Sequence, residues 1–348
     1  MRVLFSGGGT IGSVSPLIAI YEEINSSVSG ADFLWLATKD GPEDKLIKSY
    51  HIPVRKISSG KFRRYFSWRN FLDPFLVLAG FFQALKIIWS YQPSVVMSAG
   101  GFVSVPVAWA AWFLRKPVTI HQQDVRPGLA NKLMAPFATI ITVTFEKSLK
   151  DFSPKKTRAV GNPVRRDILS GKREQGYQIF GLDPNLPTLL VIGGGTGALS
   201  LNNLIVNSLP GLVGFCQVIH ITGGRLEVEA SHSRYHSFDF LTDQLKHAYA
   251  VADLVVSRAG MSSLTELASW QKPLIVIPIP ASHQEDNAAE FFRNNAAVMV
   301  DERELSPEIL VKVIQELIND KPSLGNLGRN IAKILPPEAA KKILELIL

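Results

Sequence analysis

Residues 3–13, VLFSGGGTIGS, form an apolar run that leads directly into a glycine-rich turn. The same pattern recurs at residues 95–104, VVMSAGGFVS, and at residues 189–198, LLVIGGGTGA. Where a strand passes through such a turn into a helix, backbone N–H groups and the positive end of the helix can bind an anion. Glycine also lets the backbone approach a phosphate without a Cβ clash. Three such turns, two in the first half and one in the second, favour a two-domain protein that handles a diphosphate.

Apolar, strand-like runs alternate with helical patterns on either side of these turns. Strands are expected at 2–6, 32–37, 53–57, 94–97, 117–120, 139–143, 188–192, 217–221, 253–256, 274–277 and 297–300. This alternation predicts an α/β protein with parallel sheets and helices on both faces. Each half is therefore expected to be a doubly wound, Rossmann-like domain whose ligands bind at the carboxyl ends of the strands.

The boundary between the halves is expected near Gly161-Asn162-Pro163, where a glycine and a proline interrupt the pattern. The chain would then divide into a first domain, 1–162, and a second domain, 163–335. Residues 336–348 begin with two prolines and continue as an amphipathic helical pattern. We expect this last helix to pack back towards the first domain.

Composition and charge narrow the function classes. The net charge of +7 favours anionic partners such as nucleotides, nucleic acid or an anionic membrane. The single cysteine, Cys216, excludes an internal disulfide. The N-terminal residues lack the pattern of a signal peptide. The longest apolar stretch, 75–89, is shorter than the roughly 20 residues of a membrane-spanning helix, so we expect none.

Further motifs extend the pattern of the glycine turns over nearly the whole chain. In chain order they are GGGTIGS at 7–13, SAGGFVSVP at 98–106, HQQD at 121–124, GNPVR at 161–165, GGGTGA at 193–198, YAVAD at 249–253, SRAG at 257–260, TELA at 265–268 and HQEDNA at 283–288. Their order and spacing resemble the MurG family of bacterial transferases. The matching family motifs are a GGTGGH turn, a second glycine loop, HEQN, GNPVR, GGSQGA, YAxAD, RSG, SEIA and HQxxNA.

This resemblance implies the GT-B fold, in which two Rossmann-like domains face a cleft. It implies an inverting transfer of N-acetylglucosamine from UDP-GlcNAc to lipid I, a polyprenyl-diphosphate-linked muramyl-peptide acceptor, forming lipid II in peptidoglycan synthesis. Neither a metal nor a cofactor is implied, and the seven histidines show no metal-ligand spacing. The charge of the departing UDP would be stabilised by helix N-termini and by Arg165, whose alternative role is that of a surface hinge arginine.

By resemblance, the donor site lies in the second half. Glu266 would bind the ribose, since a carboxylate can accept hydrogen bonds from both hydroxyls. Phe240 and Leu241 would flank the uracil, and the amide of Gln284 suits sugar hydroxyls. Arg258 would bind the nucleotide; alternatively it is a surface arginine in a strand-to-helix turn. The expected donor-binding residues are Arg165, Gly195, Thr196, Gly197, Phe240, Leu241, Arg258, Met261, Ser262, Glu266 and Gln284.

The acceptor site would lie in the first half, where the chain departs from the family. The family's first turn ends in histidine, but this chain has Ser13, whose hydroxyl has no useful pKa for a base. The carboxylate of the HEQN tetrad has moved to the fourth place, Asp124. We therefore hypothesise that Asp124, or His121 beside it, accepts the proton of the acceptor hydroxyl. The expected catalytic residues are Asp124, His121 and Ser13. The expected acceptor-binding residues are Thr10, Ile11, Gly12, Ser13, Gly100, Gly101 and Asp124.

Alternatives remain open for this site. Asp124 can instead cap the turn and helix that follow Arg126-Pro127. The acceptor site can also be degenerate, which favours a GT-B transferase acting on another lipid acceptor or a non-catalytic nucleotide-sugar-binding scaffold at the membrane. A dinucleotide oxidoreductase is disfavoured, because no acidic residue ends the second expected strand, 32–37, where the ribose of NAD would be held.

A membrane-facing segment is expected at residues 61–69, KFRRYFSWR, where basic residues alternate with aromatic ones. Basic groups attract anionic lipid headgroups and aromatic rings enter the membrane interface. The resemblance implies peripheral binding at the cytoplasmic face of the cell membrane. We expect most apolar residues of 74–89 to belong instead to a core helix. Such a pattern can also bind single-stranded nucleic acid, but no nucleic-acid motif accompanies it.

Overall fold

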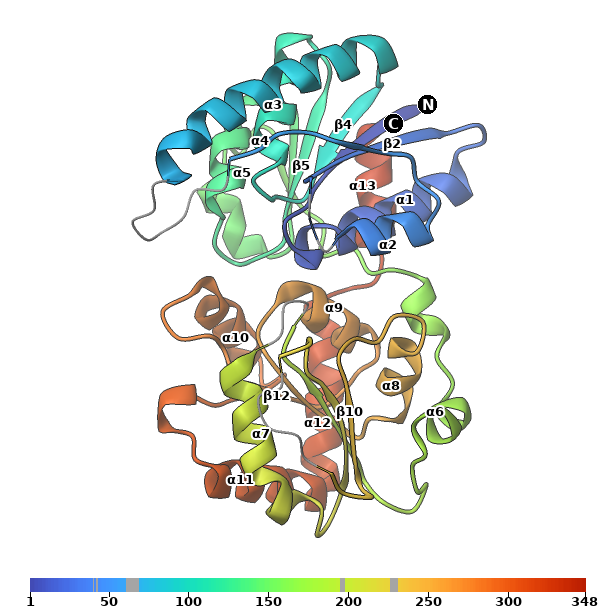
Figure 1. Ribbon diagram of the computed structural model, residues 1–348, viewed down its shortest axis with the longest axis vertical. Coiled ribbons are helices and arrows are strands. Elements are labelled where there is room, and N and C mark those ends of the chain that lie inside the picture. Colours follow the sequence, from blue (N-terminus) through green and yellow to red (C-terminus); the bar gives the residue numbers. More distant parts are fainter. Residues whose placement is uncertain (40, 42, 61–68, 195–197, 226–230) are drawn as a thin grey trace. The chain divides into compact units, whose positions relative to one another are not determined.

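The computed structural model (Figure 1) describes residues 1–39, 41, 43–60, 69–194, 198–225 and 231–348. The chain divides into two compact units. Unit 1 consists of Met1–Arg165 and Pro337–Leu348, and unit 2 consists of Arg166–Pro336. The chain therefore passes from one unit to the other after Arg165 and again after Pro336.

Unit 1 is built on a seven-stranded sheet in the order β3-β2-β1-β4-β5-β6-β7, with every pair parallel. The strands are β1 (Arg2–Ser6), β2 (Asp32–Ala37), β3 (Val54–Lys56), β4 (Val95–Ser98), β5 (Val118–Gln122), β6 (Ile140–Val143) and β7 (Thr157–Ala159). Leu4 in β1 is in register with Leu34 on one side and with Val96 on the other. These central strands are nearly continuous apolar runs because helices cover both faces of the sheet.

The helices of unit 1 form one layer on each face of its sheet (Figure 1). They are α1 (Ser15–Ser27), α2 (Glu43–Ser49), α3 (Arg69–Tyr91), α4 (Ser104–Phe113), α5 (Leu129–Met134) and α13 (Ala339–Ile347), with 3-10 turns η1 (Ile11–Ser13), η2 (Ala135–Phe137) and η3 (Glu146–Asp151). Helices α3, α4 and α5 lie on one face, and α1, α2 and α13 lie on the other. Helix α13 packs against α1 and contributes the buried residues Ile343 and Leu344.

Unit 2 has a six-stranded parallel sheet in the order β10-β9-β8-β11-β12-β13. Its strands are β8 (Thr188–Ile192), β9 (Gln217–Ile221), β10 (Tyr235–Phe238), β11 (Leu254–Ser257), β12 (Leu274–Val276) and β13 (Val298–Met299). Its helices are α6 (Arg173–Phe180), α7 (Leu199–Leu212), α8 (Leu245–Val251), α9 (Met261–Ser269), α10 (His283–Arg293), α11 (Pro307–Asn319) and α12 (Lys321–Ile334), with 3-10 turns η4 (Asp167–Ser170) and η5 (Glu302–Glu304). Helices α7 and α11 pack together over one apolar face of the sheet.

The strand order of each sheet reverses at one place. In unit 1 the chain moves outward in opposite directions from the neighbouring strands β1 and β4, and in unit 2 from β8 and β11. Ligands of doubly wound sheets bind outside the carboxyl ends of the strands at such a switch point. The glycine turns of unit 1 follow β1 and β4, while Gly193-Gly194 and the turn 258–260 follow β8 and β11. All four turns therefore occupy switch points.

Helix α3 bears on two expectations, the absence of a membrane-spanning helix and the burial of residues 74–89. Leu72–Tyr91 is long and apolar enough to cross a membrane by length and composition, the one such helix among the described residues. The expectation that most of its apolar residues lie in the core was wrong, since only 22% of that segment is buried. One face does pack on unit 1, where Ala84 and Ile88 join the core and Gly80 lies against the backbone of Ser58.

Candidate functional site

The two glycine turns of unit 1 touch each other at the switch point. Gly100 and Gly101 have positive φ angles, 99° and 87°, which favour glycine. A Cβ on Gly101 would lie 2.7 Å from the carbonyl oxygen of Gly8, so no larger residue fits between the turns. The side chain of Gln123 donates to the carbonyls of both turns, at 3.0 Å to Gly12 and 3.3 Å to Ala99. The two turns thus form one backbone surface.

The expected acceptor residues in these turns differ in exposure. Thr10 is exposed, Ile11 and Gly12 are half-buried, and Ser13 is buried. The hydroxyl of Ser13 donates to the carbonyl of Thr10 at 3.2 Å, which occupies its proton within the turn. This geometry gives Ser13 a structural part and does not support its expected part in catalysis.

The first two residues of the tetrad at 121–124 end β5, and the last two lie in the loop after it, at the same edge of the sheet. His121 is buried, with Nδ1 2.9 Å from Thr142 Oγ1 and Nε2 2.8 Å from Asn162 Oδ1. Burial lowers the pKa of His121 to about 4, although the hydrogen bond with Asn162 opposes this shift. Both ring nitrogens are therefore engaged inside the unit. The expectation that His121 accepts a proton from the acceptor is not supported.

Asp124 is the member of the tetrad that reaches the surface, since 121–123 are buried and Asp124 is half-buried. Gln122 holds the backbone of this loop by donating to the carbonyls of Asp124 at 2.8 Å and Arg126 at 3.0 Å. Helix α5 starts at Leu129 with Gly128 as its N-cap. Asp124 is therefore not the N-cap of that helix, while capping of the turn at Arg126-Pro127 stays an alternative for it.

In unit 2, Arg258 lies in the turn after β11 and is only 3% exposed. Its guanidinium makes a bidentate ion pair with Glu302, with N···O distances of 3.0 and 2.6 Å. It also donates to the Ile277 carbonyl at 3.1 Å and to the Ser200 hydroxyl at 2.8 Å. Arg258 therefore links α7, η5 and the loop after β12. It is not the surface arginine that the sequence offered as an alternative, and its part in nucleotide binding stays a prediction.

The partner of Arg258 is held in its charged form. Burial by itself would raise the pKa of Glu302, but the hydrogen bonds from Arg258 and Ser200 and the nearby guanidinium charge outweigh it. The pKa of Glu302 consequently lies below its usual range. No sequence pattern pointed to Glu302, because it lies 44 residues after Arg258, in the charged 3-10 turn η5.

Helix α10 fixes the same turn from its N-terminal end. The side-chain oxygen of Gln284 accepts hydrogen bonds from the N–H groups of Ala259 and Ile279, both at 3.2 Å. The buried amide of Asn287 donates to the Ala259 carbonyl at 3.1 Å. The oxygen of Gln284 is engaged by these loops. If Gln284 binds the sugar as expected, its amide nitrogen is therefore the atom that donates to it.

Glu266 lies on α9, one residue after the buried Thr265, and is itself buried. The hydroxyl of Tyr249 donates to its carboxylate at 2.8 Å, so the YAVAD motif in α8 positions the TELA motif in α9. Met261 is buried at the start of α9 and Ser262 is half-buried in its first turn. The expected residues Gly195, Thr196 and Gly197 lie outside the described residues.

Phe240 and Leu241 follow β10 at the carboxyl edge of the sheet. Phe240 is 57% exposed, whereas Leu241 is buried. Gly224, in the loop after β9, lies opposite the Phe240 ring, and a Cβ there would be 3.6 Å from it. An exposed aromatic ring beside a glycine backbone provides a flat apolar surface for a base.

A buried polar network supports that surface. His220 lies 2.9 Å from the Tyr235 hydroxyl and 3.0 Å from the Asn202 side-chain oxygen. The Asn202 amide then donates to the carbonyls of Thr222 at 2.9 Å and Arg225 at 2.8 Å, which fixes the loop containing Gly224. None of these residues stood out in the sequence, since they belong to no motif.

The stability of unit 2 is expected to fall in acid because of this network. Burial lowers the pKa of His220 to about 4 from its ordinary 6.5, so the folded protein keeps it neutral. Above pH 6.5 His220 is neutral in both the folded and the unfolded chain, so the network makes its full contribution to the free energy of unfolding. Between pH 6.5 and 4 the unfolded chain binds a proton that the folded chain excludes, which costs about 1.4 kcal/mol per pH unit. Urea denaturation at pH 7 and pH 5 measures this loss, and an equal loss in His220→Gln would contradict it.

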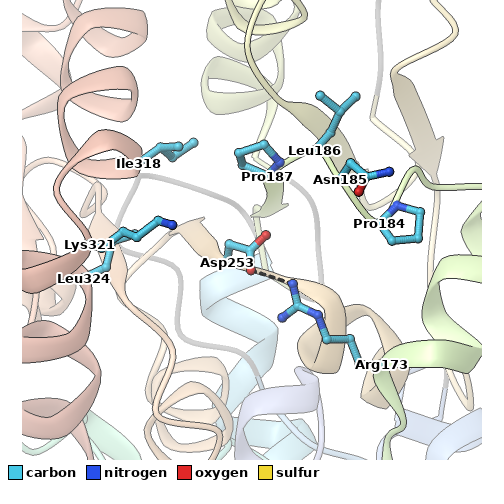
Figure 2. Close-up of a pocket in the computed structure, with 9 residues that line it drawn as sticks. All are labelled: Arg173, Pro184, Asn185, Leu186, Pro187, Asp253, Ile318, Lys321 and Leu324. Atoms are coloured by element: carbon cyan, nitrogen blue, oxygen red, sulfur yellow. Dashed lines mark hydrogen bonds and ion pairs between the residues drawn. The ribbon is translucent and has the colours of Figure 1, made fainter.

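A pocket of unit 2 lies apart from the switch point. Figure 2 shows a pocket of about 380 Å³, lined among others by Arg173, Pro187, Asp253 and Lys321. Arg173 and Asp253 form an ion pair at 2.8 Å. Since Pro187 and Asp253 precede β8 and β11, this pocket is at the amino edge of the sheet. Within the described ranges, no group of three or more His, Cys, Asp or Glu side chains could hold a metal ion.

Comparison with known proteins gives a consistent result. The model of the glycosyltransferase family 28 N-terminal domain matches residues 3–143, and that of the family 28 C-terminal domain matches residues 188–343. The UDP-N-acetylglucosamine–N-acetylmuramyl-(pentapeptide) pyrophosphoryl-undecaprenol N-acetylglucosamine transferase of Clostridium botulinum is 36% identical, covering 99% of this chain and 98% of its own. The transferase of the same name from Clostridium novyi is 38% identical, covering 92% of this chain and 91% of its own.

The solved structures agree with these relatives. The crystal structure of Acinetobacter baumannii MurG matches with a TM-score of 0.74 and 25% identity, covering 99% of this chain and 98% of its own. The two parallel-sheet units and this neighbour confirm the expected GT-B fold class. By both family models and by its full-length relatives, the chain belongs to glycosyltransferase family 28 and, within it, to the MurG family.

Proposed function

We propose that this protein transfers N-acetylglucosamine from UDP-GlcNAc to lipid I and so forms lipid II in peptidoglycan synthesis. The observation that carries this proposal is the position of the glycine turns at the switch points of both sheets, in a chain that aligns over its full length with transferases of that name. Phosphate groups bind where such turns lead into helices. One diphosphate belongs to the donor and the other to the acceptor.

Unit 2 is proposed to bind the donor. Its carboxyl edge carries the exposed Phe240 for the uracil and the Glu266 carboxylate for the ribose, with Tyr249 holding that carboxylate in place. Backbone N–H groups at the start of α9, near Met261 and Ser262, stabilise the diphosphate, with Arg165 and the turn 195–197 as further contributors. Arg258 is assigned a positioning role, because its guanidinium is engaged with protein groups.

Unit 1 is proposed to bind the acceptor along the turns that contain Thr10, Gly12 and Gly101. Asp124 is the proposed general base. Its carboxylate takes the proton of the acceptor hydroxyl, whose oxygen then bonds to the anomeric carbon of N-acetylglucosamine. The bond to UDP breaks with inversion, and the leaving diphosphate keeps the bonding electrons. The developing charge is stabilised by N–H groups in unit 2.

The transfer is tested with purified protein, radiolabelled UDP-GlcNAc and a short-chain lipid I analogue, without added metal. We expect label in the lipid product. Binding of UDP-GlcNAc without transfer to this acceptor would overturn the proposal. Transfer to a different polyprenyl diphosphate in a parallel reaction would then indicate another lipid acceptor, for which the replacement of the family histidine by Ser13 gives a reason.

Unit 1 is also proposed to bind the cytoplasmic face of the membrane through α3, α4 and α5. These helices expose the apolar residues Leu72, Phe75, Leu76, Leu78, Phe82, Trp89, Trp112, Phe113, Leu129 and Leu133. Basic residues Lys86, Arg115 and Lys132 are exposed on or beside them, whereas their one acidic residue, Asp73, is buried. A basic, apolar surface of this size favours an anionic lipid interface. The segment 61–68, which the sequence favoured, lies outside the described residues.

Replacing Phe75 and Phe82 together by serine is expected to weaken binding to phosphatidylglycerol vesicles at least about tenfold, since these rings are 71% and 61% exposed and each gains about 1.5–3 kcal/mol on full burial. Co-sedimentation measures the change. Phe292→Ser is the matched control, because Phe292 is 55% exposed on α10 of unit 2. An equal effect of the control, or none of the double variant, would contradict the membrane assignment.

A further inference from the structure

One buried acidic residue of unit 1 belongs to no motif and has no part in the proposed reaction. Glu43 is the first residue of α2 and is completely buried. One carboxylate oxygen accepts the backbone N–H of Gly9 at 3.1 Å. The other accepts the backbone N–H of Thr38 at 3.2 Å and also the Thr38 hydroxyl. Glu43 therefore connects the first glycine turn to the end of β2.

The carboxylate fits closely against this turn. A Cβ on Gly8 or on Gly41 would overlap its oxygens, so the backbone approaches Glu43 only because both residues are glycine. Gly9 has a φ of 84°, and a Cβ there would overlap the ring of Phe102 in the second turn. The first turn is thus enclosed between Glu43 and the second turn.

A buried carboxylate costs free energy unless hydrogen bonds or an opposite charge compensate it. Within the described residues no lysine or arginine pairs with Glu43, so its compensation comes from the donors of Gly9 and Thr38. Displacing the turn would leave the carboxylate unsatisfied. The conformation of Gly9 is consequently coupled to Glu43.

We propose that Glu43 is a positioning residue for the acceptor. By fixing the Gly9 N–H, its carboxylate sets the direction of the following backbone, residues 10–13, towards the acceptor diphosphate. This inference rests on the proposed function, since it assumes that the turn binds that diphosphate.

Glu43→Gln tests the proposal with little change in shape. The glutamine oxygen can satisfy Thr38, but its NH2 group then faces the Gly9 N–H, and two donors cannot bond. We expect the KM for the lipid I analogue to rise roughly 10- to 100-fold, while the KM for UDP-GlcNAc stays within about twofold. Asp44→Asn is the matched control: it removes the same charge from the next residue, which instead pairs at the surface with Lys48 and Lys56.

A second readout does not depend on activity. Hydrogen–deuterium exchange of the peptide containing residues 7–13 is expected to accelerate in Glu43→Gln and to remain unchanged in Asp44→Asn. An unchanged acceptor KM together with unchanged exchange would overturn the inference. A fall in kcat with both KM values unchanged would indicate a merely structural role and would also overturn it. If the wild-type protein transferred nothing to lipid I, the proposed function would fail, while the exchange experiment would still decide whether Glu43 positions the turn.

Discussion

Asp124→Asn is expected to reduce the rate of N-acetylglucosamine transfer by roughly 10²- to 10⁴-fold. The substitution keeps the shape of the side chain and removes its ability to accept a proton. His121 and Ser13 cannot take over, because His121 has both ring nitrogens engaged and the Ser13 hydroxyl donates within its own turn. Since the donor is assigned to unit 2, the dissociation constant for UDP-GlcNAc should stay unchanged.

Single-turnover kinetics with the lipid I analogue, together with calorimetric titration of UDP-GlcNAc, measure both quantities. Asp151→Asn serves as the control, because it removes the same charge from a half-buried position at the end of η3. If Asp124→Asn transferred sugar within a few-fold of the wild-type rate, the base would have to be another group. Weaker UDP-GlcNAc binding in this variant would place Asp124 with the donor instead.

Arg258→Met is expected to destabilise unit 2 by about 3–5 kcal/mol. The substitution leaves Glu302 as an uncompensated charge at a largely buried site, where the pair had N···O distances of 3.0 and 2.6 Å. It also removes the donors to Ile277 and Ser200, so the turn 258–260 loses its connection to α7 and η5. Activity should fall in parallel with the folded fraction.

Urea denaturation followed by circular dichroism measures this loss. The neighbouring pair Arg303–Asp301 provides the control, because it is exposed and has an N···O distance of 2.5 Å. Arg303→Met should cost much less stability than Arg258→Met, as is typical of surface ion pairs. A stable Arg258→Met variant with weakened UDP-GlcNAc binding would instead return Arg258 to the role of a nucleotide ligand.

The central strands could be predicted from the sequence because they are apolar runs buried on both faces. β1, β2, β8 and β9 begin and end at the expected residues. The edge strands β7 and β10 were missed, since they are short and half-polar and are defined by pairing with one neighbour. The exposed face of α3 was misjudged for a related reason. An apolar sequence indicates that a helix avoids water, but it does not distinguish a helix packed in the protein core from one with an exposed apolar face.

Some features of the candidate site could likewise be predicted from the sequence, and others could not. Glycine turns have a local signature, and their positions follow from the strands before them. The partners of Arg258 and His121 could not be foreseen, because Glu302 and Asn162 are distant in sequence and meet them only through the fold. A motif residue can be retained for its bonds to the protein as well as to a ligand. In this protein, the burial of the side chain distinguishes a motif residue that bonds to the protein from one that can reach a ligand.

The discontinuity of unit 1 affects how the chain is made. Most of unit 1 is synthesised first, yet Ile343 and Leu344 of α13 belong to its buried core beside Val160. Unit 2 is continuous in sequence, and domains generally fold as units during synthesis. Until α13 is synthesised, unit 1 therefore lacks the helix that packs on α1, and the apolar residues that α13 covers wait for nearly the whole of translation. Unit 1 is the first to be started and the last to be completed.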